Sequence, residues 1–225
     1  MRMTLDDVQS RVAAVTDLDQ DTTNIPTDDY SLRTTYINMA QKEWAEAYDW
    51  SVLYTEYNML VSTSTGNASV VLPANFRKLA SYPKIMVDST AYQFSQVRPE
   101  EDDQYSDNDK RVWILGSPNS QYILRVFGAS LSSGASVKVP YYRSPASLAT
   151  GTDIAEVPNA DYLVQRTIAY VWGSKEDARF PTAKAEAEII LQNMLEFEQV
   201  PSRASDWDRV KTVEETRYNF RLGRD

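Results

Sequence analysis

Residues 30–79 read YSLRTTYINMAQKEWAEAYDWSVLYTEYNMLVSTSTGNASVVLPANFRKL, and the pattern changes within this stretch decide the fold. In the first part, apolar and aromatic residues recur with the period of a helix, which predicts a helix over 29–48. From residue 51 the period becomes two, which predicts a strand over 51–61. A second short strand follows and ends in a Leu-Pro-x-x-Phe turn at 72–76. The stretch has no group suited to catalysis, and this favours a structural role.

Three further helices are predicted from apolar periodicity. The first starts at Thr4, an N-cap residue followed by acidic residues in the first turn. The third covers 162–174, with Pro158 at the first helical position, and the fourth begins near Pro181. The residues expected on the buried faces are, in chain order, Leu5, Val8, Val12 and Val15; Arg33, Ile37, Ala40, Trp44, Ala47 and Tyr48; Val164, Ile168, Val171 and Trp172; and Ala183, Ala187, Ile190, Met194 and Phe197. We expect Trp44, Tyr48 and Trp50 to fix the second helix near Trp172.

The middle of the chain reads as a series of short strands separated by turn residues. They are expected at 68–72, 84–87, 91–94, 111–115, 121–127 and 137–142, and 144–157 reads as a linker. The predicted class is therefore α+β. The N- and C-terminal helix pairs, within 1–50 and 158–200, would form one helical bundle. An antiparallel β-rich domain at 51–157 would be inserted between them, and 201–225 would form an extended C-terminal arm.

The composition excludes several classes of function. The chain has no Cys and no His, so disulfides, Cys/His zinc sites, thiolate nucleophiles and imidazole bases are impossible. It has no apolar run long enough to predict a membrane helix, and its polar N-terminus does not resemble a secretory signal. The net charge of -9 makes the chain a poor candidate for binding DNA or an anionic membrane.

The charge is unevenly distributed along the chain. The last 25 residues carry a net charge of +1, whereas the remainder carries -10. Because acidic residues alternate with the basic ones in this arm, and aromatic residues lie among them, docking on a protein partner is favoured over single-stranded nucleic acid. A loose terminus is the alternative. The candidate binding residues are Arg203, Trp207, Arg209, Lys211, Arg217, Tyr218, Phe220 and Arg221.

Two acidic segments are candidates for other chemistry. Residues 17–28 begin with the D-x-D-x-D spacing of an EF-hand loop, but Thr22 stands where the turn needs Gly, and Asp28 replaces the final Glu. A solvated connection is favoured there, and cation binding stays open. Residues 100–109 hold six carboxylates, which could serve a carboxylate-dependent or metal-dependent hydrolase. A solvated loop is the simpler interpretation, and we predict neither a catalytic nor a metal site.

Two stretches resemble the head-to-tail adaptor, or connector, proteins of tailed bacteriophages. The first is YINMAQKEWAEAYDW at 36–50, followed by strands and VVLPANFRKL at 70–79. The second is NADYLVQRTIAYVWGSKEDARFPTAKAEAEIILQNML at 159–195, which is similar to the closing helical hairpin of that family. The long β-rich middle is more similar to the adaptors of short-tailed phages.

The resemblance implies a structural virion protein, not an enzyme, with no cofactor. It implies a homo-oligomeric ring, typically a dodecamer, that joins the capsid portal to the tail and continues the DNA channel. The expected partners are the portal protein, bound through the C-terminal arm, further copies of the chain, and the next tail component, a nozzle or tail tube protein. DNA would pass through without specific binding, and no membrane is involved. The protein would lie in the virion neck or tail, and in the host cytoplasm during assembly. The alternatives are the hydrolase above and another virion binding module.

Overall fold

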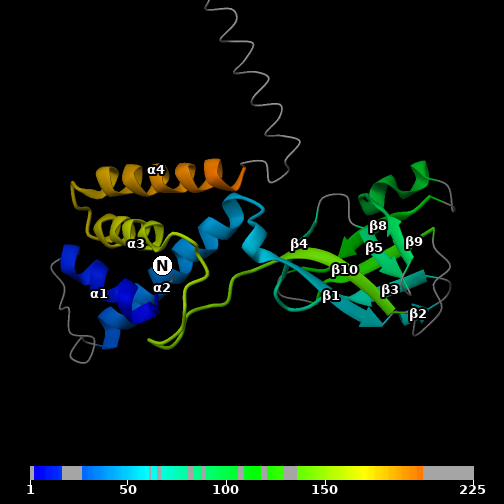
Figure 1. Ribbon diagram of the computed structural model, residues 1–225, viewed down its shortest axis with the longest axis horizontal. Coiled ribbons are helices and arrows are strands. Elements are labelled where there is room, and N and C mark those ends of the chain that lie inside the picture. Colours follow the sequence, from blue (N-terminus) through cyan, green and yellow to red (C-terminus); the bar gives the residue numbers. More distant parts are fainter. Residues whose placement is uncertain are drawn as a thin grey trace, which may run out of the picture.

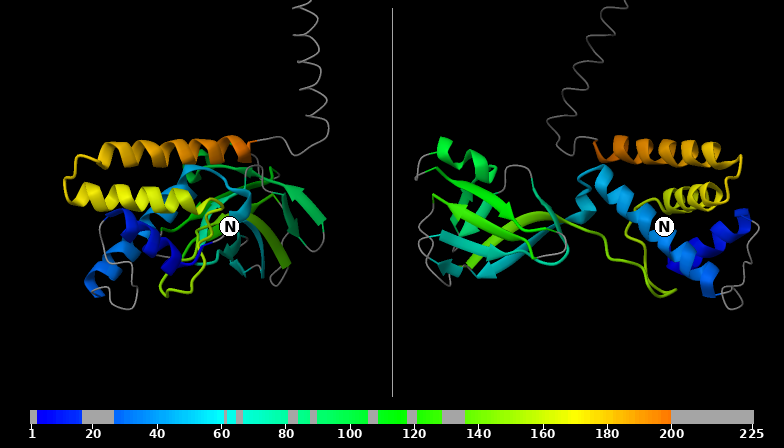
Figure 2. Two further views of the ribbon diagram at one scale, coloured as in Figure 1. Left: turned by 60° about the vertical axis from the view of Figure 1, so that its left-hand side comes forward. Right: turned by 180° about the vertical axis from the view of Figure 1, so that it is seen from behind.

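The computed structural model describes residues 3–16, 27–60, 62–64, 67–80, 84–87, 90–105, 109–117, 121–128 and 136–199. Within them, four α-helices gather at one end of the molecule and the β-strands at the other (Figure 1). The prediction of a mixed α+β class is therefore confirmed. Seen from behind, the two parts are joined by β1 and by the segment that follows β10 (Figure 2). In the described residues, no helix combines the length and the apolarity that a membrane span needs.

The helices are α1 (Leu5–Thr16), α2 (Thr27–Ala47), α3 (Ala160–Ser174) and α4 (Phe180–Glu198). α3 packs against each of the other three. Thr4 and Asp7 cap α1 reciprocally: the Thr4 hydroxyl accepts from the Asp7 N–H at 3.2 Å, and Asp7 Oδ2 accepts from the Thr4 N–H at 3.0 Å. Asn159 caps α3 through its Oδ1, which accepts from the Asp161 N–H. Pro158 therefore precedes the cap and does not occupy the first helical position.

Most of the predicted helix faces are buried in one core, which includes Leu5, Ile37, Trp44, Ile168 and Met194. Three predictions were wrong, because Val15, Ala47 and Phe197 are exposed. At these positions the helix turns the side chain away from the surface that neighbouring elements cover. Ala13 and Ala45 are buried instead. The polar side chains that share the interior are Gln9, Thr16, Arg33, Gln41 and Thr167.

The strands form two five-stranded sheets. The first has the order β1-β10-β5-β6, with β4 also paired to β10; the second has the order β2-β3-β9-β8-β7. Their bounds are β1 Tyr54–Leu60, β2 Ser62–Ser64, β3 Asn67–Val71, β4 Phe76–Leu79, β5 Lys84–Val87, β6 Thr90–Gln93, β7 Ser95–Gln96, β8 Arg111–Leu115, β9 Ile123–Phe127 and β10 Ser136–Arg143. The pairing is antiparallel except between β7 and β8, which are parallel.

Inward-facing side chains of both sheets form a second hydrophobic core, separate from the helical one. It includes Val70 and Leu124 from one sheet and Val137 and Val139 from the other. The predicted strands lie close to the observed ones. Two kinds of difference remain: residues 51–53 form a 3-10 helix before β1, and the short strands β2, β4 and β7 were not predicted.

Candidate assembly surface

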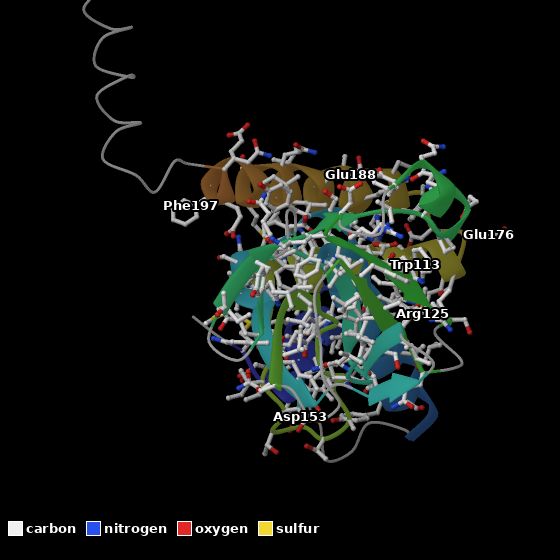
Figure 3. The ribbon with its side chains drawn as sticks, turned by 90° about the vertical axis from the view of Figure 1, so that its right-hand side faces the viewer. Trp113, Arg125, Asp153, Glu176, Glu188 and Phe197 are labelled. Atoms are coloured by element: carbon white, nitrogen blue, oxygen red, sulfur yellow. The ribbon has the colours of Figure 1, made fainter. Side chains whose placement is uncertain are left out.

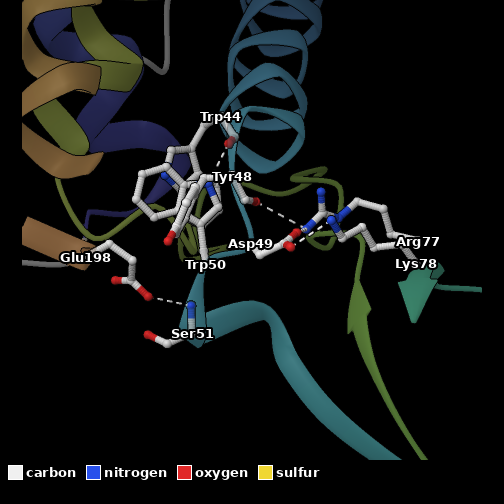
Figure 4. Close-up of polar contacts among 8 residues, drawn as sticks. All are labelled: Trp44, Tyr48, Asp49, Trp50, Ser51, Arg77, Lys78 and Glu198. Carbon is white, nitrogen blue, oxygen red and sulfur yellow. Dashed lines mark hydrogen bonds and ion pairs between the residues drawn. The ribbon is translucent and has the colours of Figure 1, made fainter. Parts of the chain in front are cut away.

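An aromatic cluster occupies the junction between the helical part and the sheets (Figure 4). The rings of Trp44 and Trp50 stack at a centroid distance of 5.1 Å, and Tyr48 meets Trp50 edge-on at 5.5 Å. Trp50 Nε1 donates to the Trp44 carbonyl at 2.6 Å, which satisfies the indole that this packing buries. The chain thus turns from α2 into β1 around two buried indoles.

Polar contacts tie further elements to this cluster. Asp49 accepts from Lys78 Nζ at 2.7 Å and from Arg77 at 3.4 Å, and Arg77 also donates to the Tyr48 carbonyl at 3.3 Å. On the other side of the cluster, the Glu198 carboxylate accepts from the Ser51 N–H at 2.6 Å (Figure 4). The start of β4 and the end of α4 are therefore both fixed to the segment that joins α2 to β1.

The segment 144–157, expected to be a linker, lies against α2, and we call it the strap. Asn38 bonds both backbone groups of Leu148: Nδ2 donates to the carbonyl at 2.9 Å, and Oδ1 accepts from the N–H at 2.8 Å. Gln41 donates to the Ala146 carbonyl at 2.7 Å. The strap also contributes Leu148, Ala155 and Val157 to the helical core. Asn38 and Gln41 were missed from the sequence, since amides on a helix follow no apolar period.

An ion pair between α2 and α3 fixes the other side of the helical part. Arg166 bonds both oxygens of Glu43, at 2.6 and 3.0 Å, and its guanidinium lies 5.1 Å from the Tyr170 ring centre. Burial would raise the pKa of the Glu43 carboxyl, but hydrogen bonds from Arg166 and Tyr170 outweigh it and hold that pKa below its usual value. Burial and the nearby Glu43 raise the pKa of Tyr170 to about 12.

Two adjoining clefts lie between α2, the strap and the Leu72–Phe76 turn. Their volumes are about 460 and 560 Å³, within the range of pockets that hold ligands. Both are lined by Lys42, Glu46, Arg77 and Ser144, so we treat them as one surface, the junction groove. Apolar side chains line much of it, including Met39, Ala45, Pro73, Phe76, Tyr122 and Pro145.

The outer face of α4 exposes two large apolar side chains. Phe197 is 82% exposed and Ile189 60% exposed. In Figure 3, Phe197 projects from the end of α4, and Asp153 of the strap lies at the opposite edge of this view. The end of α4 lies beside Ser51, so the last described residues of the chain lie next to the junction.

The predicted sites fall on different parts of the structure. All eight candidate residues of the arm lie outside the described residues, as do most of 17–28 and the side chains of Asp102, Asp103 and Asp107. Glu100 and Glu101 lie in a 3-10 helix at Pro99–Gln104, where Glu101 accepts from the Arg98 N–H at 3.3 Å. In the ranges that the structure describes, no three Asp or Glu side chains gather as a metal site would require. The described part of the acidic segment therefore contains a 3-10 turn that Glu101 caps.

A protein-family model matches nearly the whole chain. The family model described as SU10 adaptor protein matches residues 3–210. The match therefore includes all four helices and both sheets. No curated protein matches the chain.

Proposed function

The chain belongs to the SU10 adaptor protein family, and from this premise we propose that it forms a ring that joins the capsid portal to the tail and continues the DNA channel. The family confirms the resemblance to the head-to-tail adaptors of tailed bacteriophages. The protein is a structural adaptor and a virion component, and its family is not an enzyme class. The ring, its dodecameric stoichiometry and its place under the portal are our proposal.

The fixed junction is the observation that carries this proposal. An adaptor must hold a portal-facing and a tail-facing surface in constant relation, because a hinge between them would misalign the channel. Here Trp44 and Trp50 stack between the two parts, and Asp49 and Ser51 bind β4 and the end of α4 respectively. Contacts from three elements at one point support a rigid connection.

The proposal divides the chain into functional parts. Residues 1–50 and 158–200 would act as a helical bundle at the centre of the ring, 51–157 as an inserted β-rich domain, and 201–225 as the arm. Two separate hydrophobic cores support the division, except at the strap: it falls within 51–157, but its side chains Leu148, Ala155 and Val157 pack in the helical core. The β-rich domain would face the next tail component, a nozzle or tail tube protein.

The arm would bind the portal. Its charges and aromatic residues suit an extended segment that docks on a protein surface, and it follows α4 at the junction. Arg203, Trp207, Arg209, Lys211, Arg217, Tyr218, Phe220 and Arg221 are the residues proposed to make this contact. DNA would pass without specific binding, because carboxylates of the acidic body that line the lumen would repel its phosphates. Assembly would take place in the host cytoplasm.

The experiment that tests the arm is truncation after Val200. The shortened chain should keep the unfolding temperature of the full chain, because the described cores end before this point. It should lose co-sedimentation with portal rings. Retained portal binding by the shortened chain would show that the arm is not the docking segment.

A further inference from the structure

We infer that neighbouring copies in the ring meet through Phe197 of one copy and the junction groove of the next. The inference rests on the proposed ring and names the contact that builds it. It begins with the exposure of Phe197, whose ring is 82% exposed on a helix that is well packed on its other side. Aromatic side chains that stand free in a monomer and fill a pocket in a partner commonly anchor interfaces.

The groove has the chemistry to receive this end of α4. Its apolar lining includes Met39, which is 44% exposed, and Phe76. Lys42 lines both of its clefts and is largely exposed, and its ion pair with Glu46, which also lines both, is long at 3.9 Å. Arg77 lines both clefts too, but it already pairs with Asp49. The exposed Glu196 precedes Phe197, so its carboxylate would enter beside Lys42 with the ring.

The two surfaces lie on opposite sides of the junction. In Figure 4, Glu198 at the end of α4 and Arg77 in the groove flank Trp50 on opposite sides. The contacts of Asp49 and Ser51 hold both in place, so Phe197 cannot reach the groove of its own chain. A projection on one side and a matching recess on the other form a head-to-tail contact, the type that closes into cyclic rings.

The test uses the absence of Cys from the chain, because introduced cysteines are then the only thiols. Full-length Met39→Cys/Phe197→Cys protein is assembled on portal rings and treated with a short bismaleimide. We expect a ladder of covalent oligomers on a denaturing gel, whereas each single variant, Met39→Cys or Phe197→Cys, stays monomeric.

Substitution provides a second readout. Phe197→Asp should lower the yield of rings at least about tenfold, since each contact loses a buried aromatic side chain. Ile154→Asp is the matched control and should have no effect on ring yield, because Ile154 is 56% exposed and does not line the junction groove. Both variants should keep the unfolding temperature of the original chain, because both positions are exposed.

Three results would overturn the inference in distinguishable ways. If rings form but the double variant gives no ladder, the groove is wrong and the ring stands. If Phe197→Cys alone forms dimers, Phe197 contacts a second Phe197 and not the groove. If its thiol resists labelling in the monomer, Phe197 packs against its own chain. If electron microscopy shows no rings on portals, the proposed function fails, and the interface fails with it.

Discussion

Asn38 holds Leu148 by both of its backbone groups, donating to the carbonyl at 2.9 Å and accepting from the N–H at 2.8 Å. The side-chain amide thereby replaces the partner that a neighbouring strand would supply. This one contact fixes the strap to α2 along a wall of the junction groove.

Asn38→Ala should lower the free energy of unfolding by about 1–3 kcal/mol, because two partly buried backbone groups lose their partner. Urea unfolding followed by circular dichroism measures the change. Asn193→Ala is the matched control, since Asn193 is exposed on α4. Equal stability of the two variants would show that the strap does not depend on this amide.

Trp50→Phe should destabilise the junction. The substitution keeps an aromatic ring but removes the indole donor to the Trp44 carbonyl, and it shortens a side chain that is 1% exposed. The lost hydrogen bond and the cavity together predict a loss of about 2–4 kcal/mol. Thermal unfolding measures it. A loss below about 0.5 kcal/mol, the usual effect of a surface substitution, would contradict a central role for the stacked pair.

The Glu43–Arg166 pair predicts a pH dependence. The pKa of Glu43 is lowered in the folded protein from the ordinary value of 4.5, so its contribution is fully present above that value. It is lost as the pH falls through the folded pKa. The Glu43 side chain is 41% exposed, so we expect about 0.5–1 kcal/mol after allowance for solvent screening.

Urea unfolding of the original chain and of Glu43→Gln between pH 3 and pH 7 measures this difference. The original chain should be the more stable at pH 7, and the two should converge towards pH 3. Glu46→Gln is the control, because Glu46 and its partner Lys42 are 3.9 Å apart and both largely exposed. A constant difference between original and Glu43→Gln across the range would rule out the carboxylate as the cause.

Strong periodic patterns made much of the fold predictable. The strand over Arg111–Leu115 was predicted residue for residue, and α2 to within two residues at each end, because both patterns match their burial. Phe197 shows the limit of this reasoning. It continues the apolar spacing of α4 from Met194, but Met194 is buried and Phe197 is 82% exposed. An apolar period shows which residues share a face, but not how far a neighbouring element covers that face.

The polar contacts of the candidate surface could not be predicted in the same way. The sequence predicted that Trp44, Tyr48 and Trp50 fix the second helix near Trp172. The structure brings the first three together, and Trp172 packs against the same helical core. It also brings Asp49 to Lys78 and Glu198 to Ser51. The partners in each pair lie far apart in the sequence, so no local pattern predicts these contacts. The strap read as a linker because its bonds to Asn38 and Gln41 are tertiary contacts.

Assembly on a portal ring tests the central claim most directly. Purified full-length chain is mixed with portal rings from the same phage, and the particles are imaged and weighed by electron microscopy and native mass spectrometry. The account predicts a closed ring of copies seated on one end of the portal, coaxial with its channel. Single copies that stay unbound, or bind without closing a ring around the channel, would contradict it.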